Sequence, residues 1–331
     1  MNSSRKLLVL AQAACLAVAM PLAAFAEELA SWNDGPTKSA ITDFVKAATT
    51  DGDPGWIAPE DRIAVFDNDG TLWSEQPAYF QAFFVFDRIK EMAPTHPEWK
   101  EQPPFKGVLE GDMSAVAASG EKGLMELLAV THSGMTDEGF DTVLGKWLET
   151  ARHPKTQRPF TEMTFAPMVE LLDYLRDNGF QTWIVSGGGI DFMRPWTEAA
   201  YGVPPQQVVG SQIAKEYQII DGKPQFMRKS DVFFVDDGAG KPIGIDRHIG
   251  KRPVMAFGNS DGDFQMLEYT TAGDGPRFAA IVHHTDADRE YAYDRESSFG
   301  KLDKALDAAP EKGWLLIDMA KDWSRVYPDA K

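Results

Sequence analysis

Short runs of apolar residues recur along the chain, and a polar loop follows each of them. The runs are rich in β-branched and aromatic side chains and lie at residues 63–66, 181–185, 253–257, 278–282 and 314–317. Residues 164–178 instead repeat apolar positions with a helical period, and Gly179 follows as a stop signal. Near-continuous apolar strands that alternate with amphipathic helices predict an α/β fold with a doubly wound parallel sheet.

Two segments depart from this alternation. Residues 77–163 are mostly helical in pattern and rich in aromatic side chains near their start, which predicts a helical cap inserted into the core domain. Residues 206–235 contain two strand-like runs around Asp221-Gly222, a dipeptide typical of tight hairpin turns. They predict a β-hairpin after the second parallel strand.

The N-terminus has the pattern of a secretory signal. Arg5 and Lys6 precede an apolar segment at residues 7–20, and Ala24-Phe25-Ala26 supplies the small residues that signal peptidase accepts. The expected division of the chain is residues 1–26 as a signal peptide cleaved after Ala26, 27–60 as an N-terminal leader, 61–76 with 164–331 as the core domain, and 77–163 as the helical cap. We therefore expect a periplasmic or secreted protein.

Composition limits the chemistry and the partners of the mature chain. The only cysteine, Cys15, lies in the predicted signal, so a cysteine nucleophile or a disulfide is not expected. Without Arg5 and Lys6 the chain carries 31 basic and 50 acidic residues, a net charge of −19. Such a charge disfavours nucleic acid and membrane surfaces as partners. The sequence indicates no membrane insertion after cleavage and no protein partner.

Polar residues follow the predicted strands at their carboxyl ends. In open α/β sheets, this edge is where ligands bind. Asp67, Asp69 and Thr71 follow the first strand, and Ser186 opens a glycine run after the second. An acidic loop, residues 258–263, follows the third strand. Carboxylates suit a hard cation such as Mg²⁺, and a hydroxyl with helix-start amides suits phosphate oxygens. The pattern is not a helix-loop-helix calcium site, because in a loop that starts at Asp67 the fifth and twelfth positions are Thr71 and Ala78, which do not supply the required ligands.

The four motifs, in this order, resemble those of the haloacid dehalogenase superfamily, in particular its phosphoserine-phosphatase-like branch with a helical cap between the first two motifs. The resemblance extends over residues 63–267 and implies a Rossmann-like core. It also implies a catalytic lysine before the third strand. Lys241 fits that position better than Lys229 or Lys251, because residues 242–249 have the pattern of the helix that leads into this strand.

The resemblance implies a role for each catalytic residue. Asp67 would attack phosphorus and form an aspartyl-phosphate, and Asp69 would protonate the leaving oxygen and later deprotonate water. Thr71 and Ser186 would orient the phosphoryl group, and Lys241 would neutralise charge beside Asp67. The charge of Asp67 is one candidate for raising the pKa of Asp69.

The resemblance also implies Mg²⁺ as cofactor, held by Asp67, the backbone carbonyl of Asp69 and the loop after the third strand. In that loop the usual direct aspartate ligand is replaced by Asn259, which brings no charge. Asp263 matches the second aspartate of the motif, and Asp261 is a further candidate for completing the metal site.

Substrate-binding candidates are Ser186, Gly187 and Gly188, with Trp73 from the first loop. Tyr79, Phe80 and Trp99 would form with Trp73 an aromatic cage for a quaternary ammonium, although a core role is the commoner one for such aromatics. Family phosphoserine phosphatases carry a glutamate that meets the substrate amino group, and here Gln76 is in register with Glu75 beside it. The choice between phosphocholine, phosphoserine and other phosphomonoesters stays open.

The sequence therefore predicts an exported, Mg²⁺-dependent phosphatase that acts on a small phosphorylated metabolite. Two other functions are weighed against it. One is a metal-independent haloacid dehalogenase, and the other is a non-catalytic binding protein on a phosphatase-like fold, which the replacement at Asn259 suggests.

Overall fold

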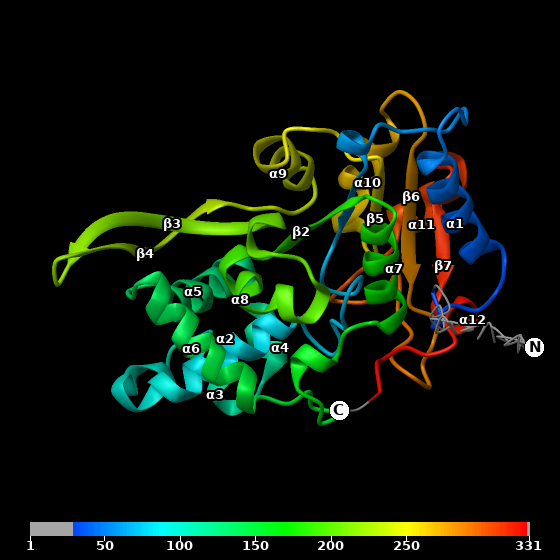
Figure 1. The fold of residues 1–331 in the computed structure, drawn as a ribbon. Helices are drawn as coiled ribbons and strands as arrows, with labels where there is room; N and C mark the ends of the chain where they lie inside the picture. Colours follow the sequence, from blue (N-terminus) through cyan, green and yellow to red (C-terminus); the bar gives the residue numbers. More distant parts are fainter. Residues whose placement is uncertain (1–28, 330–331) are drawn as a thin grey trace, which may run out of the picture.

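A computed structural model describes residues 29–329 of the chain and shows an α/β core with an inserted group of helices (Figure 1). The predicted signal peptide and Cys15 lie outside the described residues. The strands are β1 (Ile63–Phe66), β2 (Gln181–Gly189), β3 (Val208–Ile220), β4 (Lys223–Phe234), β5 (Met255–Gly258), β6 (Phe278–His283) and β7 (Leu315–Asp318). They form one seven-stranded sheet in the order β4-β3-β2-β1-β5-β6-β7, in which only the β3–β4 pair is antiparallel.

Helices cover both faces of this sheet, as the alternating pattern predicts. They are α1 (Pro36–Thr49), α7 (Ala166–Asp177), α8 (Ile190–Tyr201), α9 (Gly240–His248), α10 (Phe264–Thr271), α11 (Lys304–Lys312) and the short α12 (Met319–Asp322). Successive strand side chains point to opposite faces, so Ala64 and Phe66 join the core under α1, α7 and α8. Ile63 and Val65 join the core under α9, α10 and α11. The predicted doubly wound sheet is confirmed.

The inserted segment between β1 and β2 is helical. It contains α2 (Phe80–Met92), α3 (Phe105–Glu110), α4 (Met113–Ala118), α5 (Gly120–His132) and α6 (Asp137–Thr150). A separate apolar cluster, with Val85, Trp99 and Leu127 among its members, stabilises this cap. Figure 1 shows the cap helices gathered on one side of the sheet, next to the hairpin.

The predicted hairpin is present and its turn lies where the sequence places it. Asp221 and Gly222 adopt positive φ angles of 48° and 76°, which a tight two-residue hairpin turn requires. The start of β3 pairs in parallel with β2, and the rest of β3 pairs with β4. The hairpin therefore extends the sheet and then projects from it over α5 and α6 (Figure 1).

Element ends differ from the sequence-based expectations by a few residues. The strand expected at 181–185 continues to Gly189, and the strand expected at 253–257 begins at Met255. Within residues 29–329, no helix combines the length and the apolar character that crossing a membrane requires.

Helix α1 of the leader belongs to the main core. Its Ile41 side chain is fully buried in the same cluster as the sheet residues. We expect Ile41→Ala to lower the free energy of unfolding by about 2–5 kcal/mol, because it leaves a cavity that the sheet cannot fill. Denaturant unfolding followed by circular dichroism measures the change.

The matched control is Ile219→Ala, at a side chain of the hairpin that is 60% exposed. It should change the unfolding free energy by no more than about 0.5 kcal/mol. Equal losses for the two variants would contradict the placement of α1 in the core.

Candidate active site

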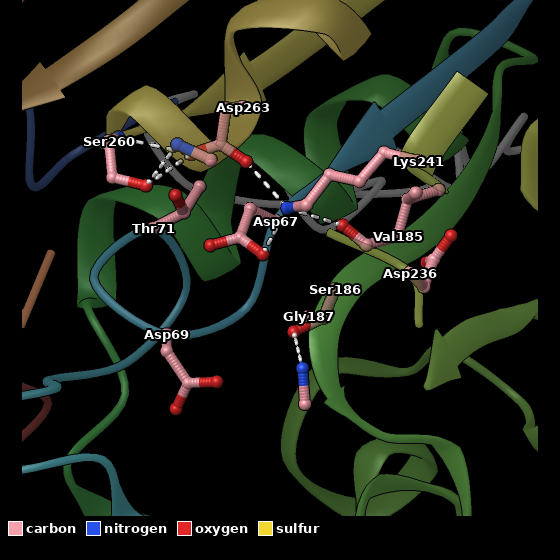
Figure 2. Close-up of polar contacts among 12 residues, drawn as sticks. Asp67, Asp69, Thr71, Val185, Ser186, Gly187, Asp236, Lys241, Ser260 and Asp263 are labelled. Atoms are coloured by element: carbon pink, nitrogen blue, oxygen red, sulfur yellow. Dashed lines mark hydrogen bonds and ion pairs between the residues drawn. The ribbon is translucent and has the colours of Figure 1, made fainter. Parts of the chain in front are cut away.

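The carboxyl ends of β1, β2 and β5 meet at one edge of the sheet, and their loops form a single polar site (Figure 2). The β1 loop brings Asp67 and Asp69, and the β2 end brings Ser186. Lys241 reaches the same point from α9. Sequence motifs that lie far apart in the chain are thus brought together as the parallel sheet predicts.

The ammonium of Lys241 connects these loops. Its Nζ donates to Asp67 Oδ1 at 2.7 Å, to Asp263 Oδ1 at 2.5 Å and to the Val185 carbonyl at 3.0 Å. Burial opposes the charged form, but Asp263 and Asp67 outweigh this effect and raise the pKa of Lys241. The residue therefore stays a cation in a buried position. The rival candidates lie elsewhere, since Lys229 pairs with Glu216 and Lys251 pairs with Asp61 near the surface.

Asp67 lies at the centre of the site and is almost fully buried. Burial raises the pKa of Asp67, the Asp263 carboxylate raises it further, and only Lys241 acts strongly in the opposite direction. Lys241 contacts Oδ1, which leaves Oδ2 without a protein hydrogen bond among the described residues. Asp67 can therefore act as an anion only with cationic help, and it has an oxygen available for a ligand.

Asp69 is held by an aromatic residue of the same loop. Trp73 Nε1 donates to Asp69 Oδ1 at 2.8 Å. Burial raises the pKa of Asp69 to about 6, although the Trp73 hydrogen bond opposes the shift. Burial is thus the main cause of the raised pKa. The charge of Asp67, which the sequence suggested as a candidate, is not. A carboxyl group with this pKa can donate and accept a proton near neutral pH.

Trp73 does not face the cavity, which corrects its assignment to substrate binding. Its ring is fully buried, stacks on Trp196 at 4.2 Å between centroids and contacts the edge of Phe80. The aromatic cage is also wrong as a whole, because Trp99 packs on Phe105 in the separate cap cluster. Trp73 instead fixes the position of Asp69.

Thr71 is likewise buried away from the cavity. Its hydroxyl donates to Asn259 Oδ1 at 3.2 Å, and the side chain is fully buried. A direct role for this hydroxyl in orienting a phosphoryl group is therefore not what the structure shows. Thr71 orients Asn259.

The second loop places its residues as predicted but uses some of its amides internally. Ser186, Gly187 and Gly188 all line the cavity. The Gly188 amide donates to Ser186 Oγ at 3.1 Å, and the Gly189 amide donates to Gln81 Oε1 at 2.8 Å. Gln81 comes from cap helix α2, so the cap contacts the core directly at this loop.

The two aspartates of the third loop have structural roles. Asp263 Oδ1 accepts from Lys241, and its Oδ2 accepts from the Asn259 and Ser260 amides at 2.9 and 3.0 Å. Both oxygens are engaged, so Asp263 holds Lys241 and is not placed as a direct metal ligand, contrary to the sequence-based assignment. Asp261 accepts amides at the start of α11 and points away from the site.

Glu75 is the residue that the sequence analysis did not assign to the site. Asn259 Nδ2 donates to Glu75 Oε1 at 2.6 Å, and the Tyr293 hydroxyl donates to the same oxygen at 2.7 Å. Glu75 is 1% exposed and lines the cavity. The sequence offers one signal for this role, which is the replacement of the usual aspartate by Asn259, since another carboxylate is then needed nearby. That Glu75 supplies it cannot be predicted from the sequence, because the two residues are 184 positions apart and meet only in the folded protein.

Glycine is required around this carboxylate. A Cβ atom at Gly300 would lie 1.7 Å from Glu75 Oε1, and one at Gly70 would lie 2.4 Å from it. Both glycines have positive φ angles, of 63° and 74°. His284 is buried beside this turn and donates from Nε2 to the Gly70 carbonyl at 2.7 Å.

The site opens into a cavity of about 630 Å³ between the core and the cap. Asp67, Asp69, Ser186 and Lys241 line its polar end. The volume lies within the range of small-molecule sites in proteins.

Comparisons with known proteins agree with the fold and the motifs. The family model described as haloacid dehalogenase-like hydrolase matches residues 64–268, more than half of the chain. The chain therefore belongs to the haloacid dehalogenase-like hydrolase family. A search of curated proteins finds no match to the chain.

Several solved structures are similar at low sequence identity. A protein of unknown function from Bordetella pertussis Tohama I is 14% identical, with a TM-score of 0.48, and the match covers 78% of this chain and 98% of that one. A functionally unknown protein from Anaerococcus prevotii DSM 20548 is 18% identical, with a TM-score of 0.44 and coverages of 75% and 85%. A phosphoserine phosphohydrolase-like protein from Francisella tularensis subsp. tularensis SCHU S4 is 17% identical, with a TM-score of 0.37 and coverages of 67% and 87%. No conclusion about substrate follows from these matches.

The Lys241 contacts predict a large effect on stability. Lys241→Met should lower the free energy of unfolding by about 3–5 kcal/mol, because it leaves the buried Asp67 and Asp263 carboxylates without their cation. Lys251→Met is the matched control, since it breaks an exposed pair with Asp61 and should cost no more than about 1 kcal/mol. Urea unfolding of both variants measures the difference. A Lys241→Met protein as stable as the control would show that the buried ion pairs do not hold the loops.

Proposed function

We propose that this protein is an exported, Mg²⁺-dependent phosphatase that hydrolyses a small phosphomonoester through an aspartyl-phosphate on Asp67. The observation that carries the proposal is the pairing of two unlike carboxyl groups in one cavity. Asp67 is bound by a buried ammonium, whereas Asp69 has a pKa raised to about 6. Family membership supports a hydrolase.

The two aspartates divide the reaction between them. An Asp67 oxygen forms a bond to phosphorus while the bond from phosphorus to the ester oxygen breaks. Asp69 gives its proton to the departing oxygen, so the product leaves as a neutral alcohol. In the second step Asp69 takes a proton from water, the water oxygen attacks phosphorus, and the Asp67 carboxylate is released with inorganic phosphate.

The remaining side chains position and stabilise the reacting groups. Lys241 favours the ionised form of Asp67, against the effect of burial, and offsets the negative charge of the approaching phosphate. Ser186 Oγ lies at the cavity surface of the β2 loop, where it can donate to a phosphoryl oxygen. Trp73 fixes the carboxyl group that moves the proton.

The donor set of the site fits Mg²⁺. Asp67, the backbone carbonyl of Asp69 and the Asn259 side-chain oxygen would hold the ion, with Glu75 in contact with Asn259. Within the described residues no three His, Cys, Asp or Glu side chains form a dedicated metal cluster. Mg²⁺ commonly takes one or two carboxylates with carbonyl, water and phosphate oxygens, so this set is sufficient. The ion would supply charge stabilisation for the transferring phosphoryl group.

Glu75 compensates for the charge that Asn259 lacks. Burial raises the pKa of Glu75, and the neighbouring Asp69 and Asp67 charges add to the shift, so a cation in the cavity is needed to keep it ionised. The Asn259 amide nitrogen donates to Glu75 and its oxygen accepts from Thr71, which leaves the second lone pair of that oxygen for a ligand. Glu75 is thus a positioning residue for Asn259 and a source of negative charge.

Export and partners are part of the same proposal. The signal pattern at residues 1–26 supports a periplasmic or secreted location, and the acidic composition supports a small phosphorylated metabolite over nucleic acid. Phosphatase activity outside the cytoplasm needs no nucleotide cofactor, which agrees with this location.

The first test removes the nucleophile. Asp67→Asn should lower phosphate release from p-nitrophenyl phosphate by at least about 1,000-fold, because the amide cannot form the covalent intermediate. Asp43→Asn, at an exposed position of α1, should keep full activity. A colorimetric phosphate assay with Mg²⁺, with and without EDTA, gives the result.

Other outcomes of this assay favour the rival functions. Full activity in Asp67→Asn would exclude Asp67 as the nucleophile. EDTA-resistant release of chloride from 2-chloropropionate, without phosphate release, would indicate a haloacid dehalogenase. Binding of phosphomonoesters without any turnover would indicate a non-catalytic binding protein.

The second test concerns the metal site and does not depend on turnover. Glu75→Gln should weaken Mn²⁺ binding, measured by electron paramagnetic resonance, by about 10- to 100-fold, because it removes the charge beside Asn259. Glu75→Gln combined with Asn259→Asp should restore most of the affinity, since the carboxylate is moved to the other member of the pair.

Glu311→Gln is the matched control on the exposed surface of α11 and should bind Mn²⁺ like the unchanged protein. Affinity that is unchanged in Glu75→Gln, or lost equally in the single and double variants, would contradict the compensating role of Glu75.

A further inference from the structure

The cavity above Asp67 has two parts of different chemistry. Its floor is polar, whereas its wall is formed mainly by apolar side chains of cap helices α2 and α5. The principal wall residues are Val85, Phe86, Leu124, Met125, Leu127 and Leu128. A phosphoryl group on the floor would use only a fraction of the 630 Å³ available. The rest of the space is left for the ester group that departs.

Positive charge is scarce in this cavity. Lys241 is the only basic residue among the described residues that line it. All three N–H groups of its ammonium are engaged, by Asp67, Asp263 and the Val185 carbonyl. Glu75 and Asp237 add acidic groups to the lining. A substrate with a second anionic group would therefore meet repulsion from these carboxylates and no free basic side chain to offset it.

Among the described residues, the polar side chains of the cap wall are Gln81 and Tyr79, and both hydrogen-bond protein atoms. Gln81 Oε1 accepts from the Gly189 amide, and Gln81 Nε2 donates to His132 Nε2 at 3.0 Å. Burial lowers the pKa of His132 to about 3, so this imidazole is neutral and accepts that bond. The Tyr79 hydroxyl accepts from the Gly300 amide at 3.3 Å. Hydroxyl groups of a sugar would lose water here and gain few partners in exchange.

We propose that the preferred substrates are phosphate monoesters of apolar alcohols or phenols, with an alkyl or aryl leaving group that carries no anionic substituent. This proposal rests on the phosphatase function proposed above. The polar residues of the floor carry out the reaction. The apolar wall favours leaving groups whose apolar surface it buries. Phosphorylated sugars and phosphorylated carboxylic acids are poor substrates for the same reason.

Three synthetic esters that share one phosphate group test the wall. They are ethyl phosphate, n-hexyl phosphate and 5-carboxypentyl phosphate, which has the length of the hexyl ester and ends in a carboxylate. The kcat/KM for n-hexyl phosphate should exceed that for ethyl phosphate by at least about tenfold, because the added methylenes are buried. It should exceed that for 5-carboxypentyl phosphate by a similar factor.

A charge placed in the wall should change this selectivity. Leu124→Lys introduces an ammonium at a cavity-lining position that is 45% exposed, so the longer side chain can be accommodated. The ratio of kcat/KM values for the hexyl and carboxypentyl esters should fall by at least about tenfold. Met113→Lys is the matched control, because Met113 is 44% exposed on α4 and does not line the cavity. It should leave the ratio unchanged.

Acetyl phosphate separates a failure of this inference from a failure of the proposed function. Its small leaving group barely reaches the wall, and in Asp67→Asn its hydrolysis should fall to the spontaneous rate measured without enzyme. Hydrolysis of acetyl phosphate with equal or reversed selectivity among the three esters would overturn the inference and leave the phosphatase function standing. Absence of phosphate release from every ester would overturn both.

Discussion

The buried ammonium of Lys241 is the contact on which the site depends. It is shared by carboxylates from the β1 and β5 loops and by the carbonyl that precedes Ser186 at the end of β2. Two buried acids that face each other would repel, so the cation is needed for the loops to approach. The same contact lowers the pKa of Asp67 against the opposing effects of burial and Asp263. Stability of the sheet edge and reactivity of the carboxylate thus have one physical origin.

Packing in the protein core also affects the pKa and the orientation of the second carboxyl group, that of Asp69. Asp69 owes its raised pKa to burial, and its orientation comes from Trp73, whose ring is stacked on Trp196 in the main core. Trp73, which looks like a substrate contact in the sequence, therefore supports Asp69, the residue that we propose transfers the proton. The cavity wall is formed by other residues of the cap, so the proposed reacting groups and the apolar wall come from different parts of the chain.

Much of the fold and of the polar site could be predicted from the sequence. Apolar runs with intervening helical patterns require a covered parallel sheet, and parallel strands bring their carboxyl-end loops together. Asp67, Asp69, Ser186 and Lys241 accordingly lie in one site. The roles of Asp263, Thr71 and Trp73 were less predictable, because a motif gives the position of a side chain along the chain but not the atom that it contacts.

Local sequence by itself determined the strands, the hairpin turn at Asp221-Gly222 and the identity of the reactive groups, since these follow from side-chain pattern and chemistry within a few residues. Only the tertiary structure decided the pairing of Glu75 with Asn259, the partial burial of Asp69, the full burial of His284, and the apolar wall over the site. Each of these is a contact between distant segments. Burial and charge are set by what surrounds a group in space, and that is fixed only when the sheet and the cap have assembled.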